Sequence, residues 1–249
     1  TNENTINSEV ICNPEANFTV FDFVCEGDVT NFTNLSEDSI IYPIVDWQWN
    51  VQGGGIYENS DNFDVNPSYL FDSCGVYLVT LTVNQDLNSY GCIDSITLPV
   101  QVYCNPDANY NVNDECFDNE QQPIEFYDAS NNGSAPINYW QWTISGGNYV
   151  SPYTQDSANT QFHFSSCGLK NFSLYVRDTN NCEDSISGSV NVWCEPTADF
   201  NAPPVCLNDT TVFQDLSNDS IVSWYWDFGD GDTAMSQNPT HVYASCDSF

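Results

Sequence analysis

The feature that most constrains the fold is a pattern of cysteines and tryptophans that occurs three times along the 249 residues. Each occurrence opens with a cysteine, a proline two residues later and an aromatic residue, in the segments Cys12 to Phe18, Cys104 to Tyr110 and Cys194 to Phe200. The opening cysteines lie 92 and then 90 residues apart. A period of this length gives each unit its own core, so it predicts an array of domains rather than a solenoid of short repeats.

Further positions recur inside each unit. A second cysteine is followed by a Trp-x-Trp pair and then by an aromatic-x-Ser-Cys segment, and the first two units carry one more cysteine in a turn. These residues are Cys25, Cys116 and Cys206; Trp47 and Trp49, Trp140 and Trp142, Trp224 and Trp226; Cys74, Cys167 and Cys246; and Cys92 and Cys182. Residues two apart lie on one face of a strand, and we expect one tryptophan of each pair to fill the core.

Hydrophobic residues alternate along the predicted strands, as in the run from Gly75 to Val83. Short strands separated by Gly, Pro, Asn and Asp predict an all-β chain of tandem immunoglobulin-like β-sandwich domains arranged as a rod. The predicted boundaries are 1–12 for the last strand of a preceding repeat, 13–103 for repeat 1, 104–193 for repeat 2 and 194–249 for repeat 3. Repeat 3 is predicted to be incomplete, and we expect the natural polypeptide to continue in both directions.

Charge and cysteine content restrict the functional class. The chain has 35 acidic residues against Lys170 and Arg177, a formal net charge of −33. Such a surface repels nucleic acid and anionic lipid, because neutralising phosphates requires many basic side chains. No apolar run is long enough to span a membrane, so membrane insertion is not expected. Eleven cysteines without a C-x-x-C pair favour disulfides, and hence an extracellular location, over zinc.

Strand topology suggests a disulfide scheme but leaves an alternative open. The preferred scheme pairs cysteines that lie at the same end of one sandwich: Cys25–Cys74, Cys116–Cys167, Cys206–Cys246, Cys12–Cys92 and Cys104–Cys182. The alternative places Cys74–Cys104 and Cys167–Cys194 across the hairpin of the last two strands, with Cys25–Cys92 and Cys116–Cys182. Spacing alone does not decide between them.

The third unit resembles the PKD domain, an immunoglobulin-like module with W-D-F-G-D-G and N-P-x-H-x-Y motifs. The matching segments here run from Trp226 to Gly231 and from Asn238 to Tyr243. Units 1 and 2 keep the tryptophan and the glycines and lose the aspartates. The resemblance covers nearly the whole chain and is strongest in its last quarter.

The additional cysteines resemble repeats in long surface adhesins of gliding Bacteroidota, which the type IX secretion system exports. This resemblance implies a cell-surface filament that adheres to surfaces or polysaccharide, with neighbouring repeats of the same chain as partners. It also implies O-glycosylation at Asp-Ser/Thr motifs. Those motifs occur at Ser39, Ser95, Ser157, Ser185, Thr210, Ser220 and Thr233.

Metal binding and catalysis receive little support. Asp227, Asp230 and Asp232 share one turn and offer oxygen ligands to Ca²⁺, although aspartates in such a turn also cap backbone amides. His163 and His241 are expected to play structural roles, and no nucleophile, zinc or phosphate-loop motif occurs. We therefore predict a non-catalytic adhesin segment. The alternative is a spacer or carbohydrate-binding module of a secreted polysaccharide- or protein-degrading enzyme.

Overall fold

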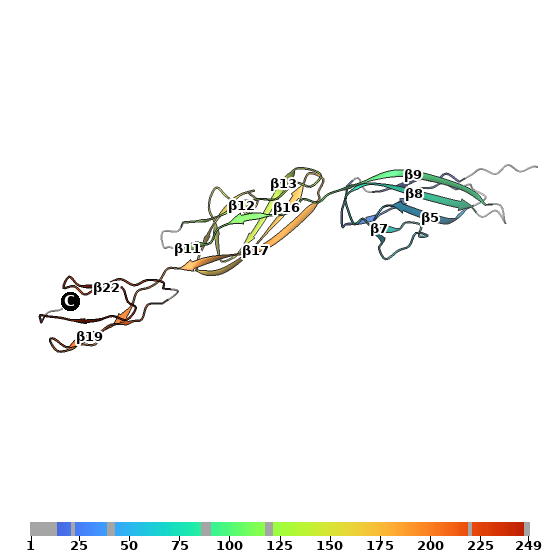
Figure 1. Ribbon diagram of the computed structural model, residues 1–249. Coiled ribbons are helices and arrows are strands. Elements are labelled where there is room, and N and C mark those ends of the chain that lie inside the picture. The colour runs from blue at the N-terminus through green and yellow to red at the C-terminus, as the bar shows by residue number, and fades with distance from the viewer. Residues whose placement is uncertain are drawn as a thin grey trace, which may run out of the picture.

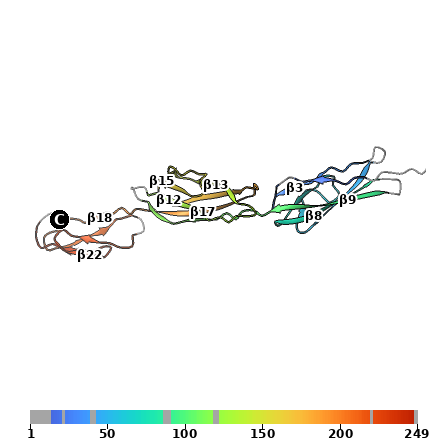
Figure 2. The ribbon, with the colours of Figure 1, turned by 90° about the horizontal axis from the view of Figure 1, so that it is seen from above.

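The computed structural model describes residues 14–20, 23–38, 43–85, 91–117, 122–218 and 221–246, and its named elements are all strands. These strands form three units that follow one another in an elongated row (Figures 1 and 2). The described residues contain no helix that is long and apolar enough to cross a membrane. Cys12 and the strand predicted before it lie outside the described residues.

Repeat 2 has two four-stranded sheets. The first has the order β10-β12-β15-β14 and the second the order β11-β17-β16-β13. The strands are β10 (Tyr110–Val112), β11 (Glu115–Phe117), β12 (Ile124–Asp128), β13 (Ile137–Ile144), β14 (Gly147–Tyr149), β15 (Thr160–Phe164), β16 (Gly168–Asp178) and β17 (Glu183–Cys194). In immunoglobulin lettering these sheets are A-B-E-D and A′-G-F-C, so the predicted β-sandwich is confirmed.

Repeat 1 repeats this plan with a more interrupted first sheet. Its strands are β1 (Phe18–Thr19), β2 (Val24–Cys25), β3 (Val29–Asn31), β4 (Thr33–Asn34), β5 (Ile44–Gln52), β6 (Ile56–Tyr57), β7 (Ser68–Leu70), β8 (Gly75–Gln85) and β9 (Cys92–Tyr103). The sheet β2-β9-β8-β5 corresponds to β11-β17-β16-β13 of repeat 2. In both repeats the A′ strand runs parallel to the G strand. It pairs with the last residues of the G strand, so the A′ strand lies at that end of the sandwich.

Repeat 3 contains three two-stranded sheets. Its strands are β18 (Phe200–Asn201), β19 (Thr210–Val212), β20 (Gln214–Asp215), β21 (Trp226–Asp227), β22 (Thr233–Ala234) and β23 (Thr240–Val242). Its inner aromatic residues, including Phe213 and Trp226, border an open cavity of about 920 Å³. The equivalent side chains of repeat 2, Phe126 and Trp142, pack there against Phe172 of β16.

The cores follow the alternation seen in the sequence. Along β8 the inward side chains Tyr77, Val79, Leu81 and Val83 are buried, and β16 buries Phe172, Leu174 and Val176. Apolar burial of this kind contributes about 25 cal/mol per Å² removed from water, so the two F strands supply much of each core. Each forms a long antiparallel pair with the strand that follows it, β9 or β17.

The tryptophans occupy equivalent places in the three repeats. Trp49 and Trp142 are almost fully buried, and Trp226 is partly buried. Each indole NH donates to a backbone carbonyl on a neighbouring loop, at 2.9, 3.2 and 2.9 Å respectively. A buried indole NH needs such an acceptor. The shared hydrogen bond shows that the three tryptophans are structurally equivalent.

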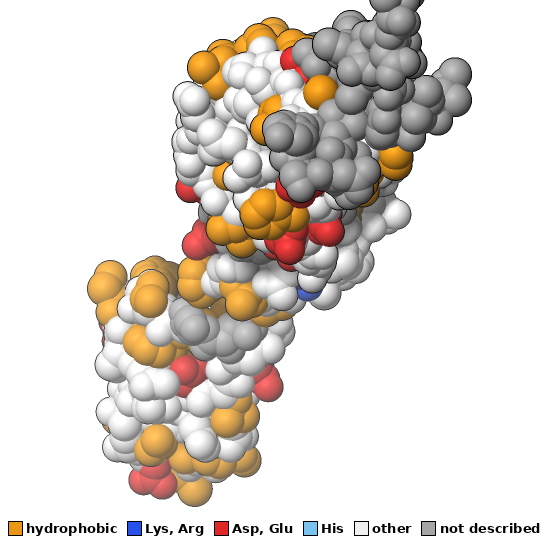
Figure 3. Space-filling view, turned by 90° about the vertical axis from the view of Figure 1, so that its right-hand side faces the viewer, with side chains coloured by type: hydrophobic (Ala, Val, Ile, Leu, Met, Phe, Trp, Pro, Cys, Tyr) orange, Lys and Arg blue, Asp and Glu red, His pale blue; other side chains and the backbone are white. Residues whose placement is uncertain are grey.

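The surface carries hydrophobic side chains among the acidic and neutral polar ones (Figure 3). In Figure 3 acidic groups form several separate patches, and basic atoms are visible at a single place on that face. Arg177 lies with its guanidinium carbon 4.9 Å from the ring centre of Tyr139 on the outer face of repeat 2. Burial, and then a hydrogen bond to Glu183, raise the pKa of the neighbouring Tyr175 to about 12.

Candidate functional site: the junction between repeats 1 and 2

The end of repeat 1 is closed by a disulfide between its last two strands. Gly75 at the start of β8 pairs with Val102 near the end of β9, so the cysteines flanking these strands face one another. Cys74 and Cys104 are bonded, with a Cα–Cα distance of 4.7 Å. Since Cys104 is also the first residue of repeat 2, this bond lies at the point where the chain passes from one repeat to the next.

A second disulfide crosses the junction. Cys25 ends β2 and lies opposite Tyr103, at the end of repeat 1 nearest repeat 2. Cys182 lies in the tight turn between β16 and β17, and its backbone NH donates to Asp178 Oδ1 at 2.9 Å. The two cysteines are bonded with a Cα–Cα distance of 5.6 Å, within the ordinary range, and both are buried.

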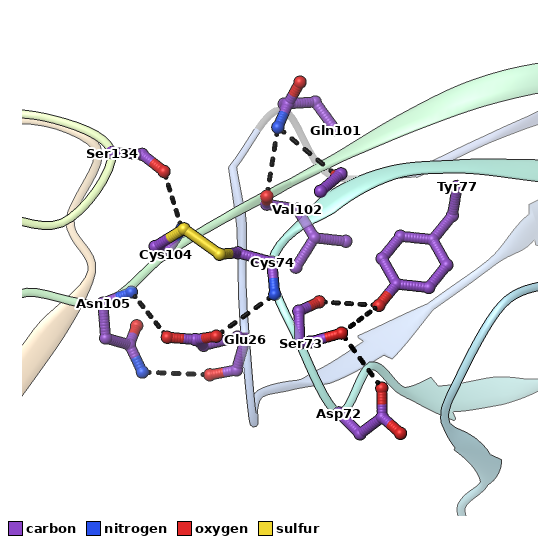
Figure 4. Close-up of a disulfide and its surroundings, with 11 residues drawn as sticks. Glu26, Asp72, Ser73, Cys74, Tyr77, Gln101, Val102, Cys104, Asn105 and Ser134 are labelled. Carbon is purple, nitrogen blue, oxygen red and sulfur yellow. Dashed lines mark hydrogen bonds between the residues drawn. A yellow bond between two sulfur atoms is a disulfide. The ribbon is translucent and has the colours of Figure 1, made fainter.

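Glu26 adds a set of hydrogen bonds beside the Cys74–Cys104 disulfide (Figure 4). Its carboxylate accepts from the backbone NH of Cys74 and from the backbone NH of Asn105, each at 3.1 Å. The Asn105 side-chain amide donates back to the Glu26 carbonyl at 3.0 Å. One residue of repeat 1 therefore binds both the closing disulfide of its own repeat and the opening segment of the next.

The opening segment is also held from the repeat 2 side. Ser134 Oγ accepts from the Cys104 NH at 2.7 Å, and the Ser134 NH donates to the Cys104 carbonyl at 3.1 Å. A Cβ added at Gly133 would collide with the carbonyl oxygens of Cys104 and Asn105, so only glycine permits this approach. The junction is thus bonded from both sides.

The preferred disulfide scheme was wrong. The bonds Cys25–Cys74, Cys116–Cys167 and Cys104–Cys182 do not form, because β9 and β17 extend far enough to place Cys104 and Cys194 opposite Cys74 and Cys167. The second of these hairpin bonds, Cys167–Cys194, has a Cα–Cα distance of 5.0 Å. The alternative scheme was correct for the two hairpins, and wrong for Cys25–Cys92 and Cys116–Cys182.

Four described cysteines are free. They are Cys92, which is partly buried, and Cys116, Cys206 and Cys246, which are exposed. The predicted bond Cys206–Cys246 is therefore wrong as well, and a bond from Cys92 to Cys12 falls on a residue outside the described ones. The free cysteines lie at positions whose equivalents elsewhere in the chain are bonded.

The W-D-F-G-D-G turn of repeat 3 is held by its own aspartates. Asp227 Oδ1 accepts from the Gly229 NH at 3.0 Å, and Asp230 Oδ1 accepts from the Asp232 NH at 3.1 Å. These bonds cap the turn, in which Gly229 and Gly231 adopt positive φ.

A histidine joins this turn. The ring of His241 stacks on Phe228 at 4.4 Å, and its Nε2 lies 2.7 Å from Asp230 Oδ2. The hydrogen bond from His241 lowers the pKa of the Asp230 carboxyl. The donor atoms brought within 4.8 Å of one another belong to Asp230, Asp232 and His241, so Asp227 is not part of this group. The structural role predicted for His241 is confirmed, and calcium binding stays a prediction.

The predicted glycosylation residues differ in accessibility. Ser95, Ser185, Thr210 and Thr233 are exposed, Ser157 is partly buried, and Ser39 and Ser220 lie outside the described residues. Modification of these residues stays a prediction.

Comparison with known proteins identifies the module. The PKD domain family matches residues 12–102 and 193–246, more than half of the chain. The chain belongs to the PKD domain family. Repeat 2 shares the four-stranded A′-G-F-C sheet of the PKD repeat before it, although residues 103–192 are not matched by the family. PKD repeats are generally non-catalytic structural modules.

Solved structures similar to this PKD chain include multidomain fragments of titin and of a nectin-like ectodomain. A three-domain I-band fragment of titin covers 91% of this chain and 83% of its own length, at 12% identity and a TM-score of 0.40. The mouse nectin-like molecule 4 ectodomain covers 73% and 65%, at 12% identity and a TM-score of 0.30. Comparison with curated proteins finds no match.

Proposed function

We propose that this chain is a stiff, non-catalytic segment of a long extracellular adhesin or filament on the cell surface. The observation that carries the proposal is the junction between repeats 1 and 2. There the chain passes through Cys104 while a separate disulfide, Cys25–Cys182, joins the same two repeats. A single flexible linker lets neighbouring domains rotate freely, whereas two covalent connections and the Glu26 hydrogen bonds restrict bending and twisting.

Two further properties support an extracellular rod. Disulfides persist outside the cytosol, where thiol reductants do not break them. A net charge of −33 keeps a long array soluble and apart from its neighbours. In this proposal the repeats hold a distal region away from the cell, and that region binds a surface or a polysaccharide.

Small-angle X-ray scattering tests the rod. The maximum dimension of the purified oxidised chain should match the end-to-end row of Figure 1. A compact particle, or a broad distribution of dimensions, would contradict the stiff arrangement.

Antibody labelling of intact cells that produce the protein tests its location on the cell surface. Antibodies raised against repeats 1 and 2 should mark filaments on the cell surface in electron microscopy. Recovery of the chain only in the medium, covalently continuous with a hydrolase domain, would contradict the adhesin and favour the spacer of a secreted enzyme.

A further inference from the structure

Each cysteine of the bond Cys25–Cys182 has an equivalent in the other repeat, one at the end of repeat 2 that leads into repeat 3 and one at the outer end of repeat 1. Cys25 lies in the A′ strand of repeat 1, opposite Tyr103 of β9, in a parallel pair. Cys116 lies in the A′ strand of repeat 2, opposite Trp193 of β17, in the same kind of pair. Tyr103 and Trp193 each precede a cysteine of a hairpin disulfide, so Cys116 occupies at the end of repeat 2 the place that Cys25 occupies at the end of repeat 1.

The other partner of the bond is repeated too. Cys182 precedes β17, and Cys92 begins β9 at the corresponding place in repeat 1. The aspartates two residues further on make the same contact: Asp94 accepts from the Ala16 NH at 2.8 Å, and Asp184 from the Ala108 NH at 2.7 Å. Cys92 therefore lies at the outer end of repeat 1 as Cys182 lies at the end of repeat 2 that meets repeat 1.

The bonded cysteines are buried, and their free equivalents are more exposed. Cys25 is 5% exposed and Cys182 is 1% exposed, and the two are bonded to each other across the junction. Cys116 is exposed and Cys92 partly so, and both are free. Cys206 follows Pro204 in repeat 3 at the matching position and is also exposed and free.

We propose that Cys116 and Cys92 are covalent docking positions for further PKD-type repeats. Cys116 takes the F–G turn cysteine of the repeat that follows repeat 2 in the array, and Cys92 takes the A′-strand cysteine of the repeat that precedes repeat 1. Each junction of the array is then joined twice, by a hairpin disulfide and by an inter-repeat disulfide. This inference rests on the proposed rod, since it requires repeats that follow one another end to end.

The chemistry is ordinary thiol oxidation. Two cysteine thiols lose two protons and two electrons and form one S–S bond. A small disulfide such as oxidised glutathione accepts them and is reduced to two thiols. In the folded array the attacking and attacked sulfurs are held together by the docked repeats, which favours this pairing over others.

Duplication of repeat 2 tests Cys116. In the full chain with residues 104–193 repeated once after residue 193, the first copy of Cys116 faces the F–G turn of the second copy. After refolding with reduced and oxidised glutathione, peptide mapping without reductant should recover Cys116 of the first copy joined to Cys182 of the second. A Cys116→Ser substitution in the first copy is the matched control, and it should release the second Cys182 as a free thiol. Absence of any Cys116–Cys182 link would overturn the proposal, provided that the hairpin bonds are intact, from Cys167 of the first copy to Cys104 of the second and from Cys167 of the second copy to Cys194.

A second duplicated chain tests Cys92. It also keeps the proposal testable if the first duplicated chain does not fold. With residues 12–193 repeated once, the two repeats already joined in the structure are placed in tandem as a pair. Mapping should then recover Cys116 of the first pair joined to Cys92 of the second. Free thiols at both positions, with Cys25–Cys182 formed in each pair, would overturn the proposal. Small-angle scattering on the same chains tests the stiff rod separately from the inter-repeat disulfides, because these disulfides can form even in a flexible array.

Discussion

Cys25 and Cys182 lie 157 residues apart in the sequence and are joined by a disulfide that passes from one PKD repeat to the next. A bond of this kind differs in its consequences from one inside a single domain. It does not close a loop within either core, so its main effect is on how the two repeats move relative to each other. The hairpin bond Cys74–Cys104 closes a short loop at the end of repeat 1 and offers a direct comparison.

The double substitution Cys25→Ser with Cys182→Ser should loosen the junction while leaving each repeat folded. We expect a broader distribution of dimensions in small-angle scattering and faster hydrogen exchange at the Asn105 amide. The double substitution Cys74→Ser with Cys104→Ser is the control, and it should lower the free energy of unfolding of repeat 1 by about 3 kcal/mol through loop entropy. A larger loss of stability in the first variant than in the second would contradict this division of roles.

Substitution of Glu26 should weaken the same junction without touching a sulfur atom. Its carboxylate accepts two backbone hydrogen bonds, and bonds to a charged acceptor contribute about 1.5–3 kcal/mol each. Only the bond from the Cys74 NH lies within repeat 1, so Glu26→Ala should lower the free energy of unfolding of repeat 1 by about 2 kcal/mol. Glu26→Gln should lower it by less, because the amide keeps one acceptor oxygen.

Chemical denaturation of the Glu26 variants measures this loss, and hydrogen exchange at Cys74 and Asn105 localises it. Glu37→Ala is a suitable control, because it also removes one exposed carboxylate from the acidic chain. Equal stability of the Glu26→Ala and Glu37→Ala variants would show that Glu26 contributes charge alone.

The first tryptophan of each pair is bonded differently in repeats 1 and 2. Trp140 donates its indole NH to Asp128 Oδ2 at 2.8 Å, whereas the buried indole NH of Trp47 has no partner among the described residues. Asn34 stands where repeat 2 has Asp128, and its Oδ1 is already bonded to the Ser36 NH at 3.0 Å. The other terminal atom of Asn34 is an NH₂ group, which cannot accept a hydrogen bond.

Asn34→Asp should therefore stabilise repeat 1 by about 1 kcal/mol, and Asp128→Asn should destabilise repeat 2 by about 1–2 kcal/mol, which is the cost of a buried donor without its acceptor. Denaturation followed by tryptophan fluorescence measures both changes. Opposite signs for the two exchanges are the essential result. A loss of stability in the Asn34→Asp variant would mean that charge repulsion in this acidic chain outweighs the new hydrogen bond.

The sequence predicted the sandwich because its strongest signals are local. Alternation along the segment from Gly75 to Val83 specifies a strand with one buried face, and the repeated Trp-x-Trp pair specifies its partner strand. The burial of Trp49 and Trp142 follows from these two features. The alternation and the Trp-x-Trp pair can both be recognised in the sequence without knowing which strands pair.

The disulfide pairing could not be read in the same way. Cys25 and Cys74 were predicted at one end of the sandwich, which was consistent with a bond between them. The length of β9 places Cys104 opposite Cys74 instead, and these two form the disulfide. The turn cysteine Cys182 then reaches into the preceding repeat, a contact that depends on how two domains dock. The signal that could have indicated it is a cysteine at each end of every repeat, which fits bonds between repeats as well as bonds within them.

Acid should act on repeat 3 through Asp215. The hydroxyl and backbone NH of Ser217 donate to this carboxylate and, with the Trp224 indole and Gln237, lower its pKa to about 2. An unfolded aspartate has a pKa of about 3.9, so the folded form binds its proton less readily. The stabilisation is therefore fully present above about pH 4 and is lost as the pH falls through about 2.

Tryptophan fluorescence of the intact chain during acid titration should show this loss, since the Trp224 NH lies 2.7 Å from Asp215 Oδ2. In Asp215→Asn the part of the transition between about pH 4 and pH 2 should disappear, because the amide cannot take up a proton in this range. Asp209→Asn removes one exposed carboxylate from the same repeat and should leave the transition in place. If the Asp209 variant also abolished it, the acid response would arise from the general charge of the repeat rather than from the bonds that hold Asp215.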